Sequence, residues 1–404
     1  MKKTLALATG LAAALGLGQA AAQVSDDVVK IGVLNDQSGL YADITGQGSV
    51  LAARMAAEDF GGTVLGKKIE IVFGDHQNKP DVGSNIARQW LDVDKVDAIA
   101  DVPTSSVALA IQEITKTKNR VFLISGAASS DLTGKACSPT GFHWTYDTYM
   151  LANGTGGALV KAGGDSWYFL TADYAFGHAL ERDTGAAVTA AKGKVLGQVR
   201  HPLNTSDFSS FLLQAQASKA KIIGLANAGG DTINSIKQAA EFGIVAGGQR
   251  LAGLLVFVTD VHSLGLKTAQ GLVVTESFYW DLNDETRAWS KNFMAKHGGK
   301  APTMVHAGVY SAVKHYLTAI KEAGTDEAGK VAEKMRQMPV NDFMTKNGQI
   351  RQDGRVMRDA YLLQVKKPEE SKGPWDYYKV LSTIPAKDAF RPIEQSECPL
   401  VKKS

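Results

Sequence analysis

The sequence predicts an α/β protein with two lobes, each built on a doubly wound parallel sheet. Short apolar runs rich in β-branched residues alternate with amphipathic segments, a pattern typical of parallel strands joined by crossover helices. The alternation starts again after residue 165, and a chain of 404 residues is too long for one hydrophobic core. These observations together favour two lobes of the same kind.

The first lobe is predicted from four strand-like runs with helical segments between them. The runs are VVKIGVL at 28–34, KIEIVFGD at 68–75, VDAIA at 96–100 and VFLIS at 121–125. Helices are expected near 46–60, near 81–93 and at 107–116, where apolar residues recur at helical spacing. This order gives a first pass through lobe 1 at residues 23–147.

The second lobe is predicted from a further run of strands. They are DSWYFLTAD at 165–173, KVLGQVR at 194–200, AKIIGLA at 220–226, RLAGLLVFV at 250–258 and GLVVTE at 271–276. A long helix is expected within 301–324, and strand patterning at 347–367 is broken by Asn-Gly and Asp-Gly turns. We therefore assign residues 148–276 to lobe 2 and expect residues 277–404 to cross back and complete both lobes.

The first residues have the pattern of a secretory signal peptide. Lys2 and Lys3 precede the apolar run TLALATGLAAALGLG, and Ala20 and Ala22 are small residues suited to signal peptidase. The run is shorter than the roughly 18 residues that span a bilayer. We expect residues 1–22 to be removed and the protein to be exported to the periplasm.

The net charge and the two cysteines indicate which partners are disfavoured and whether a disulfide forms. Loss of Lys2 and Lys3 leaves 42 of the 44 basic residues against 41 acidic ones, which does not favour nucleic acid or an anionic surface. Cys137 and Cys398 are expected to form a disulfide in an oxidising compartment, with two buried thiols as the alternative.

Known catalytic signatures are absent from the sequence. It has no G-x-S-x-G elbow, phosphate loop, H-E-x-x-H or cysteine metal spacing. Four loop histidines are more typical of surface or hydrogen-bonding residues than of metal ligands: His76, His143, His178 and His262. We expect a protein that is not an enzyme and uses no cofactor or metal.

A hydroxyl cluster follows the third strand, in DVPTSSVALA at 101–110. Ser or Thr often caps a helix, which would explain one hydroxyl of Thr104, Ser105 and Ser106. Three hydroxyls beside the free amides of a helix N-terminus also suit a carboxylate. Other strand ends carry NDQSGLYADITGQG, SGAASSDLT, TADYAFG, ANAGGDT and FVTDVHSLG. Because ligands bind at the carboxyl ends of parallel strands, we expect one cleft between the lobes.

In order and spacing, these segments resemble the leucine/isoleucine/valine-binding protein family, the type I periplasmic receptors of ATP-driven importers. The resemblance runs from VKIGVLNDQSGLYAD through FVTDVHSLGLKTAQGL to NGQIRQDGR. It implies the type I periplasmic-binding-protein fold. It also implies a monomer that closes on a small carboxylate, an amino acid or related organic acid, and delivers it to the membrane permease of an ABC importer.

The resemblance also implies site residues. In lobe 1 the carboxylate would meet Thr104, Ser105, Ala127 and Ser129, with Tyr41 covering the ligand. In lobe 2 the chain has Phe176 where family receptors have Tyr, Asp231 or Thr232 where they have an aromatic residue, and Asp260 where they have Glu. The carboxylate half matches the family, and the amine half is altered.

The ligand class stays open at this point. Two acids, Asp231 and Asp260, favour a ligand with an amine, because an unpaired buried carboxylate is costly. Phe176 and the apolar residues before Thr259 instead favour an amine-free aromatic or aliphatic acid. A ligand sensor is a further alternative. A secreted hydrolase is less favoured, because no His and acid pair recognisably with Ser105 or Ser129.

Overall fold

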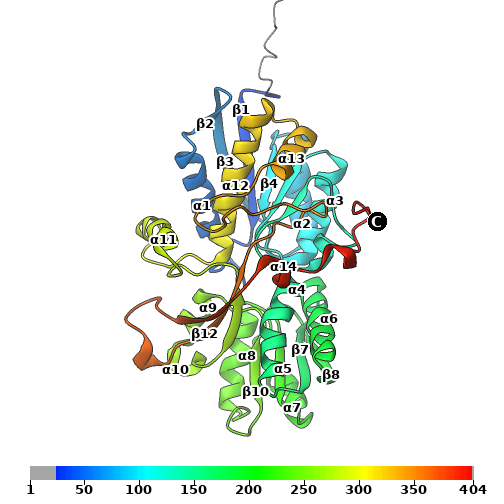
Figure 1. Ribbon diagram of the computed structural model, residues 1–404, viewed down its shortest axis with the longest axis vertical. Coiled ribbons are helices and arrows are strands. Elements are labelled where there is room, and N and C mark those ends of the chain that lie inside the picture. The colour runs from blue at the N-terminus through cyan, green and yellow to red at the C-terminus, as the bar shows by residue number, and fades with distance from the viewer. Residues whose placement is uncertain (1–23, 403–404) are drawn as a thin grey trace, which may run out of the picture.

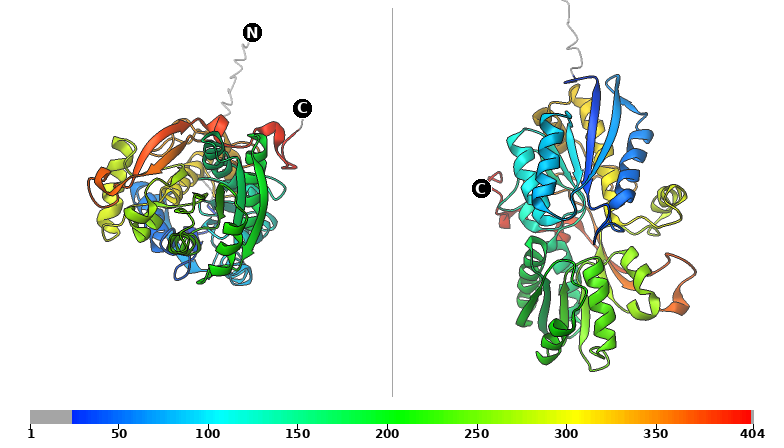
Figure 2. Two further views of the ribbon diagram at one scale, coloured as in Figure 1. Left: turned by 90° about the horizontal axis from the view of Figure 1, so that it is seen from below. Right: turned by 180° about the vertical axis from the view of Figure 1, so that it is seen from behind.

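The computed structural model describes residues 24–402 and shows two lobes stacked along the long axis of the molecule (Figure 1). The signal peptide predicted at residues 1–22 lies outside the described residues. Within residues 24–402, no helix is long and apolar enough to cross a membrane. Figure 2 shows the same two-lobed outline from behind.

Lobe 1 is a six-stranded sheet in the order β2-β3-β1-β4-β5-β6, with helices on both faces. Every neighbouring pair is parallel except β2 and β3. The strands are β1 (Val28–Asn35), β2 (Thr63–Val64), β3 (Lys67–Asp75), β4 (Ala98–Asp101), β5 (Val121–Ile124) and β6 (Gly141–His143). The helices are α1 (Gly46–Asp59), α2 (Pro80–Asp92), α3 (Ser105–Thr117), α12 (Met304–Ala323) and α13 (Ala328–Gln337).

The long helix α12 returns the late part of the chain to lobe 1. It begins where Thr303 Oγ1 accepts a hydrogen bond from His306 N–H, and it ends at Gly324 in the left-handed conformation. Its imidazole at His306 packs so close to α1 that a Cβ on Gly48 would lie 2.4 Å from the ring. Glycine at position 48 therefore lets the two helices approach.

Lobe 2 has a four-stranded parallel sheet in the order β10-β9-β7-β8. Its strands are β7 (Ser166–Ala172), β8 (Lys194–His201), β9 (Ile222–Ala226) and β10 (Arg250–Gly253). Around it lie α4 (Thr148–Leu151), a π-helical turn (Ala152–Gly156), α5 (Gly157–Lys161), α6 (Ala175–Ala190), α7 (Ser209–Ala217), α8 (Gly230–Glu241), α9 (Val258–Leu264) and α10 (Leu266–Ala269). All four strands were expected from the sequence.

Two expectations for lobe 2 are wrong in detail. The strand expected at 250–258 ends at Gly253, because Phe257 N–H bonds to the Asp260 carboxylate and starts α9. The strand expected at 271–276, β11 (Val273–Glu276), does not join the parallel sheet. It pairs antiparallel with β12 (Ala360–Val365), which in turn pairs with β13 (Tyr378–Ile384). Together the three form a separate sheet.

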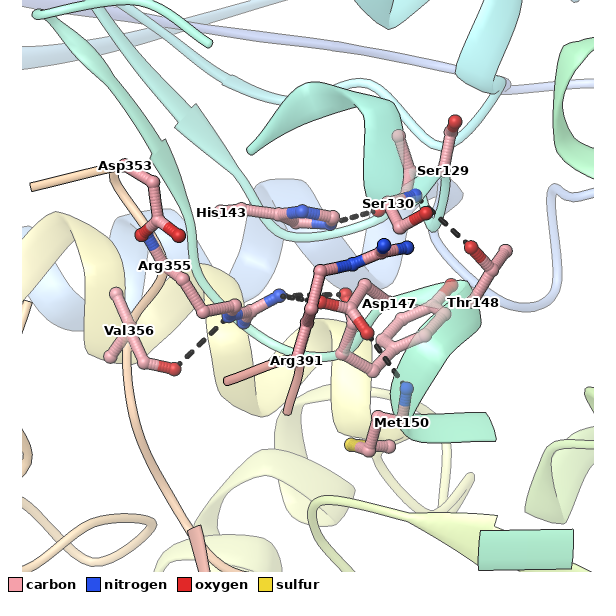
Figure 3. A network of polar contacts seen from close by, with 12 residues as sticks. Ser129, Ser130, His143, Asp147, Thr148, Met150, Asp353, Arg355, Val356 and Arg391 are labelled. Atoms are coloured by element: carbon pink, nitrogen blue, oxygen red, sulfur yellow. Dashed lines mark hydrogen bonds and ion pairs between the residues drawn. The ribbon is translucent and has the colours of Figure 1, made fainter. Parts of the chain in front are cut away.

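Segments that pass between the lobes are held by buried polar contacts (Figure 3). The fully buried Arg355 donates from Nη1 to Tyr146 O at 3.1 Å, and lies 3.5 Å from Asp147 Oδ2. Its guanidinium also stacks on the Phe390 ring at 4.4 Å. Two further helices are α11 (Asp284–Lys296), a peripheral helix, and α14 (Ala386–Ala389), near the C-terminus. The predicted Cys137–Cys398 disulfide is present and joins the C-terminal tail to lobe 1.

Candidate functional site

A cavity lies between the lobes at the carboxyl ends of both parallel sheets. Its volume is ≈ 20 Å³, enough for about one water molecule. The lining residues come from both lobes: Tyr41, Ile44, Pro103, Gly126, Ala128, Tyr146, Tyr174, Phe176, Ala228, Leu255 and Phe257. None carries a formal charge. Because the cavity is so small, a larger ligand enters only if the lobes separate.

Part of the lobe 1 wall is formed by the loops at the ends of β4 and β5, through Pro103, Gly126 and Ala128. Asp101 and Val102 both have positive φ, 79° and 54°, which is rare for residues other than glycine. This strained turn aims the chain through Pro103 into α3. A Cβ on Gly126 would lie 2.8 Å from Asp101 Oδ1 and 2.8 Å from Pro103 Cα, so the two loops touch there.

The predicted hydroxyls position this wall and do not cap α3. Thr104 is the N-cap residue, but its hydroxyl donates to Asn78 Oδ1 and caps no amide. Ser105 Oγ accepts from Ser129 N–H at 3.2 Å, and Ser129 Oγ accepts from Asp131 N–H at 3.3 Å. The Ser105–Ser129 bond ties the β4 loop to the β5 loop, and the Thr104–Asn78 bond ties the β4 loop to the segment after β3.

Several main-chain amides beside this wall have no acceptor among residues 24–402. They are the N–H groups of Ser105, Ser106 and Val107 in the first turn of α3 and those of Ala127 and Ala128 in the adjacent loop. The positive end of a 13-residue helix and these free donors favour an anionic group. The wall can therefore bind a carboxylate through main chain.

Tyr41 reaches the cavity from the loop between β1 and α1. Asp36 shapes this loop by accepting from the N–H groups of Gly39 and Tyr41, both at 2.8 Å. The Tyr41 hydroxyl meets the Tyr174 hydroxyl of lobe 2 at 2.5 Å. This is a direct hydrogen bond between the lobes at the cavity wall.

The lobe 2 wall is apolar. Phe176 stands in the first turn of α6 and contacts Tyr174, with ring centroids 5.8 Å apart. Phe257 meets Tyr146 of the crossing segment edge to face at 6.1 Å. Ala228 and Leu255 complete this side. Such a wall suits the hydrophobic body of a ligand.

The lobe 2 polar residues predicted from the sequence lie outside this cavity. Both oxygens of Asp231 accept main-chain N–H bonds, from Asn204 at 3.1 Å and Thr205 at 2.8 Å. Thr232 donates to Asn227 Oδ1 at 2.7 Å. Asp260 Oδ2 accepts from Phe257 N–H at 2.8 Å. Burial raises the pKa of both Asp231 and Asp260 to about 7.

Asp260 does line a second interlobe cavity of ≈ 410 Å³. Asp43 of lobe 1 lines the same space, and its charge helps to raise the pKa of Asp260. The two cavities share Ile44, so the second lies next to the first.

The predicted loops are therefore at the cavity, although the lining residues are partly different ones. Tyr41 and Phe176 line it directly. Thr104, Ala127 and Ser129 are sequence neighbours of lining residues, and Ser105 accepts a hydrogen bond from Ser129 N–H. Sequence reasoning missed Tyr146, Tyr174, Leu255 and Phe257. Their signal was the aromatic and aliphatic content of GFHWTYDTY, TADYAFG and LLVFVTD at strand ends.

The four loop histidines bond to nearby groups, and His76 Nδ1 accepts a hydrogen bond from Asn78 N–H at 3.0 Å. His143 Nε2 contacts Ala127 O at 2.7 Å, next to Ser129 but bonded to main chain (Figure 3). His178 pairs with Asp173, and His262 pairs with Tyr377. In the described part of the chain, no three His, Cys, Asp or Glu side chains are grouped to hold a metal ion.

Comparisons with known proteins agree with the two-lobed fold. The periplasmic binding protein family model matches residues 28–373. A Leu/Ile/Val-binding protein homolog 6 of Brucella melitensis is 24% identical over 364 residues, which cover 87% of this chain and 91% of the relative.

Solved structures are similar over almost the full length. A periplasmic binding protein of Burkholderia mallei is 51% identical with a TM-score of 0.91, covering 93% of this chain and 100% of that one. A branched chain amino acid ABC transporter periplasmic ligand-binding protein of Burkholderia xenovorans is 41% identical with a TM-score of 0.82 and the same coverage, 93% and 100%.

A third structure shares the fold at lower identity. It is an ABC transporter solute-binding protein from R. palustris in complex with benzoate, 21% identical with a TM-score of 0.81, covering 92% of this chain and 99% of that one. From the family match and the two-lobed fold with its interlobe cavity, we conclude that the chain belongs to the periplasmic binding protein family and is a solute-binding protein of the ABC-importer type.

Proposed function

We propose that the protein captures a small amine-free carboxylate with an apolar body, aromatic or branched aliphatic, and delivers it to the permease of an ABC importer. The observation that carries the proposal is the asymmetry of the cavity. Free main-chain amides stand at its lobe 1 wall, and uncharged, mostly apolar side chains form its lobe 2 wall. An anionic head and a hydrophobic body complement these two walls.

The lobe 2 acids argue against an ammonium group in this cavity. A ligand ammonium needs a carboxylate or several carbonyls once it leaves water. Both carboxylate oxygens of Asp231 accept hydrogen bonds from the main-chain N–H groups of residues 204 and 205. Asp260 lines the neighbouring cavity, and one of its oxygens accepts a hydrogen bond from Phe257 N–H. The benzoate complex of a neighbour with the same fold supports an aromatic acid as one member of the class.

A branched-chain amino acid is the second candidate. The 41% identical Burkholderia xenovorans protein bears that name, and Asp260 with Asp43 gives the neighbouring cavity an acidic lining. An amino acid would have to place its ammonium group beside Asp260 in the neighbouring cavity while its carboxylate binds the free amides at the N-terminus of α3.

Matched ligand pairs separate the two candidates. Thermal unfolding is measured with leucine against 4-methylpentanoate and with phenylalanine against 3-phenylpropanoate, because each pair differs only in the amine. A ligand at about 100 times its Kd stabilises the folded state by about 2.7 kcal/mol. We expect shifts with the amine-free members and none with the amino acids. The reverse result would support the second candidate.

The proposal also covers where the protein acts and what it does to its ligand. We infer export with cleavage near Ala22, a monomer in the periplasm, and binding without chemical conversion. Prolonged incubation of a bound acid with the pure protein should return it unchanged, and appearance of a product would contradict this part.

A further inference from the structure

Asp101 is a buried acid at the end of β4, next to the Gly126 and Pro103 part of the lobe 1 wall. It is fully buried, and its Oδ1 accepts no main-chain or charged donor among residues 24–402, although the Ser49 hydroxyl faces the carboxyl and helps to lower its pKa. Oδ2 accepts from Asn35 Nδ2 at 3.0 Å. Oδ1 would be 2.8 Å from a Cβ on Gly126, and Gly126 and Pro103 both line the cavity.

Within residues 24–402, no Lys, Arg or His forms an ion pair with Asp101, and none is among the groups that shift its pKa. The groups facing it are neutral: Asn35 from β1, Ser49 from α1, and Tyr146, whose phenol pKa is raised well above its ordinary value by burial. Glu276 and Asp260 also face Tyr146, and burial raises the pKa of both carboxyls, that of Asp260 to about 7.

A ligand carboxylate at the free amides of α3 would come close to this acid. The strained 101–102 turn leads directly into that helix, so the two negative groups would share one end of it. At about 5 Å and an effective dielectric constant of about 20, their repulsion raises the proton affinity of Asp101 by roughly a few hundredfold. Proton uptake from solvent removes this repulsion.

We propose that Asp101 sets the charge requirement of the site: a monocarboxylate ligand binds together with one proton, which Asp101 takes up. The inference rests on the proposed function, because it needs an anionic group at α3. Asp101 is a specificity-determining residue. Because it is fully buried, it acts on the ligand through the electrostatic effect of its charge and not by direct contact. Burial already raises the pKa of Asp101 to about 6 in the ligand-free protein, which brings the uptake close to neutral pH.

The test is titration calorimetry with benzoate and 4-methylpentanoate at pH 7 in phosphate and in Tris, which differ in ionisation enthalpy. For a bound probe we expect uptake of about 0.5 to 1 proton per ligand. Benzamide, which has the same ring but no charge, should bind without uptake. Lowering the pH from 7.5 to 6.5 should tighten benzoate by up to about tenfold, because one proton per pH unit is a factor of ten at most.

Asp101→Asn should reduce the uptake to below about 0.2 proton and, at pH 7.5, tighten benzoate by about tenfold. The matched control is Asp97→Asn at the other end of β4, about 13 Å away along the strand. Asp97 is also a buried acid, with its pKa raised to about 7 and its Oδ2 accepting Lys30 N–H. That variant should keep the wild-type uptake.

Two results would overturn the inference while the proposed function stands. One is a bound carboxylate with no proton uptake in the wild type, a result that does not depend on the folding of any variant. The other is undiminished uptake in Asp101→Asn, which would place the proton on another acid such as Asp260 or Glu276. If neither acid binds and leucine does, the proposed function itself fails and this inference falls with it.

Discussion

Lobe 1 meets the cavity with two strand-end loops, at Pro103 and at Gly126, as well as with Tyr41 and Ile44, whereas lobe 2 meets it with aromatic and aliphatic side chains alone. The lobe 1 wall depends on the strained 101–102 turn and on Gly126, which must remain free of a Cβ. The lobe 2 wall depends on the bulk of Tyr174, Phe176 and Phe257. The difference teaches that one lobe can recognise the carboxylate common to a ligand class while the other selects the body.

The largest effect is expected from closing the lobe 1 wall with Gly126→Ala. Its Cβ would collide with Asp101 Oδ1 and Pro103 Cα, and overpacking of this kind costs about 1–3 kcal/mol. We expect affinity for benzoate and for the small acid acetate to fall together, by up to about a hundredfold. Gly157→Ala, where no atom lies within 4 Å of the new Cβ, is the control and should bind normally. If affinity fell for benzoate but not for acetate, the lobe 1 wall would not be recognising the carboxylate, which would contradict this account.

The next largest effect is expected from opening the lobe 2 wall with Phe257→Ala. The change removes a side chain that is 1% exposed but keeps the main-chain N–H that bonds to Asp260. Burial of a phenylalanine contributes about 1.5–3 kcal/mol, so benzoate should weaken about tenfold to a hundredfold. Acetate, which lacks a hydrophobic body, should be unaffected. If calorimetry showed equal losses of affinity for benzoate and acetate, the lobe 2 wall would not be selecting the hydrophobic body of the ligand, which would contradict this account.

A smaller effect is expected from Tyr174→Phe, which removes the hydroxyl contact with Tyr41 across the lobes. A neutral hydrogen bond contributes about 0.5–1.5 kcal/mol, so affinity should fall about twofold to tenfold, mostly through faster dissociation. In a double-mutant cycle with Tyr41→Phe, the second change should add little. Additive losses would show that the hydroxyls act separately on the ligand.

The smallest effect on binding is expected from Asp231→Asn, because this carboxylate faces the 204–205 main chain. Affinity for any amine-free acid should change less than about twofold. Stability should respond to pH instead. Folded Asp231 holds its proton up to about pH 7, whereas the unfolded chain releases it near pH 4, so wild type loses stability relative to the variant as pH rises between these values. Denaturant unfolding from pH 4 to pH 8 measures this. A large loss of ligand affinity would instead mark Asp231 as a ligand contact.

Much of the fold could be predicted because the signals are local. Strand composition, helix spacing and turn residues locate eight strands of the two parallel sheets, and the two cysteines pair as expected. The end of β10 at Gly253 was missed because LLVFV has strand composition, while a tertiary neighbour, β9, pairs only with residues 250–253. The antiparallel pairing of β11 depends on β12, almost 90 residues later, which no local pattern reveals.

The candidate site was predicted at the level of loops but not of side chains. Parallel-sheet topology brings the strand ends together, which any correct strand assignment implies. Which residue of a loop faces the cavity depends on main-chain torsions such as the positive φ of Val102, and these cannot be inferred from residue type. Polar residues such as Thr104 and Asp231 attracted attention, yet their side chains bond to neighbouring loops.

A crystal structure of the complex with 3-phenylpropanoate tests the central claim most directly. We predict the carboxylate within hydrogen-bond distance of the Ser105–Val107 and Ala127–Ala128 amides, and the ring against Phe176 and Phe257. No side-chain carboxylate should contact the ligand. A ligand carboxylate on the lobe 2 side would contradict this account. So would a complex that forms only with phenylalanine and places its ammonium on Asp260.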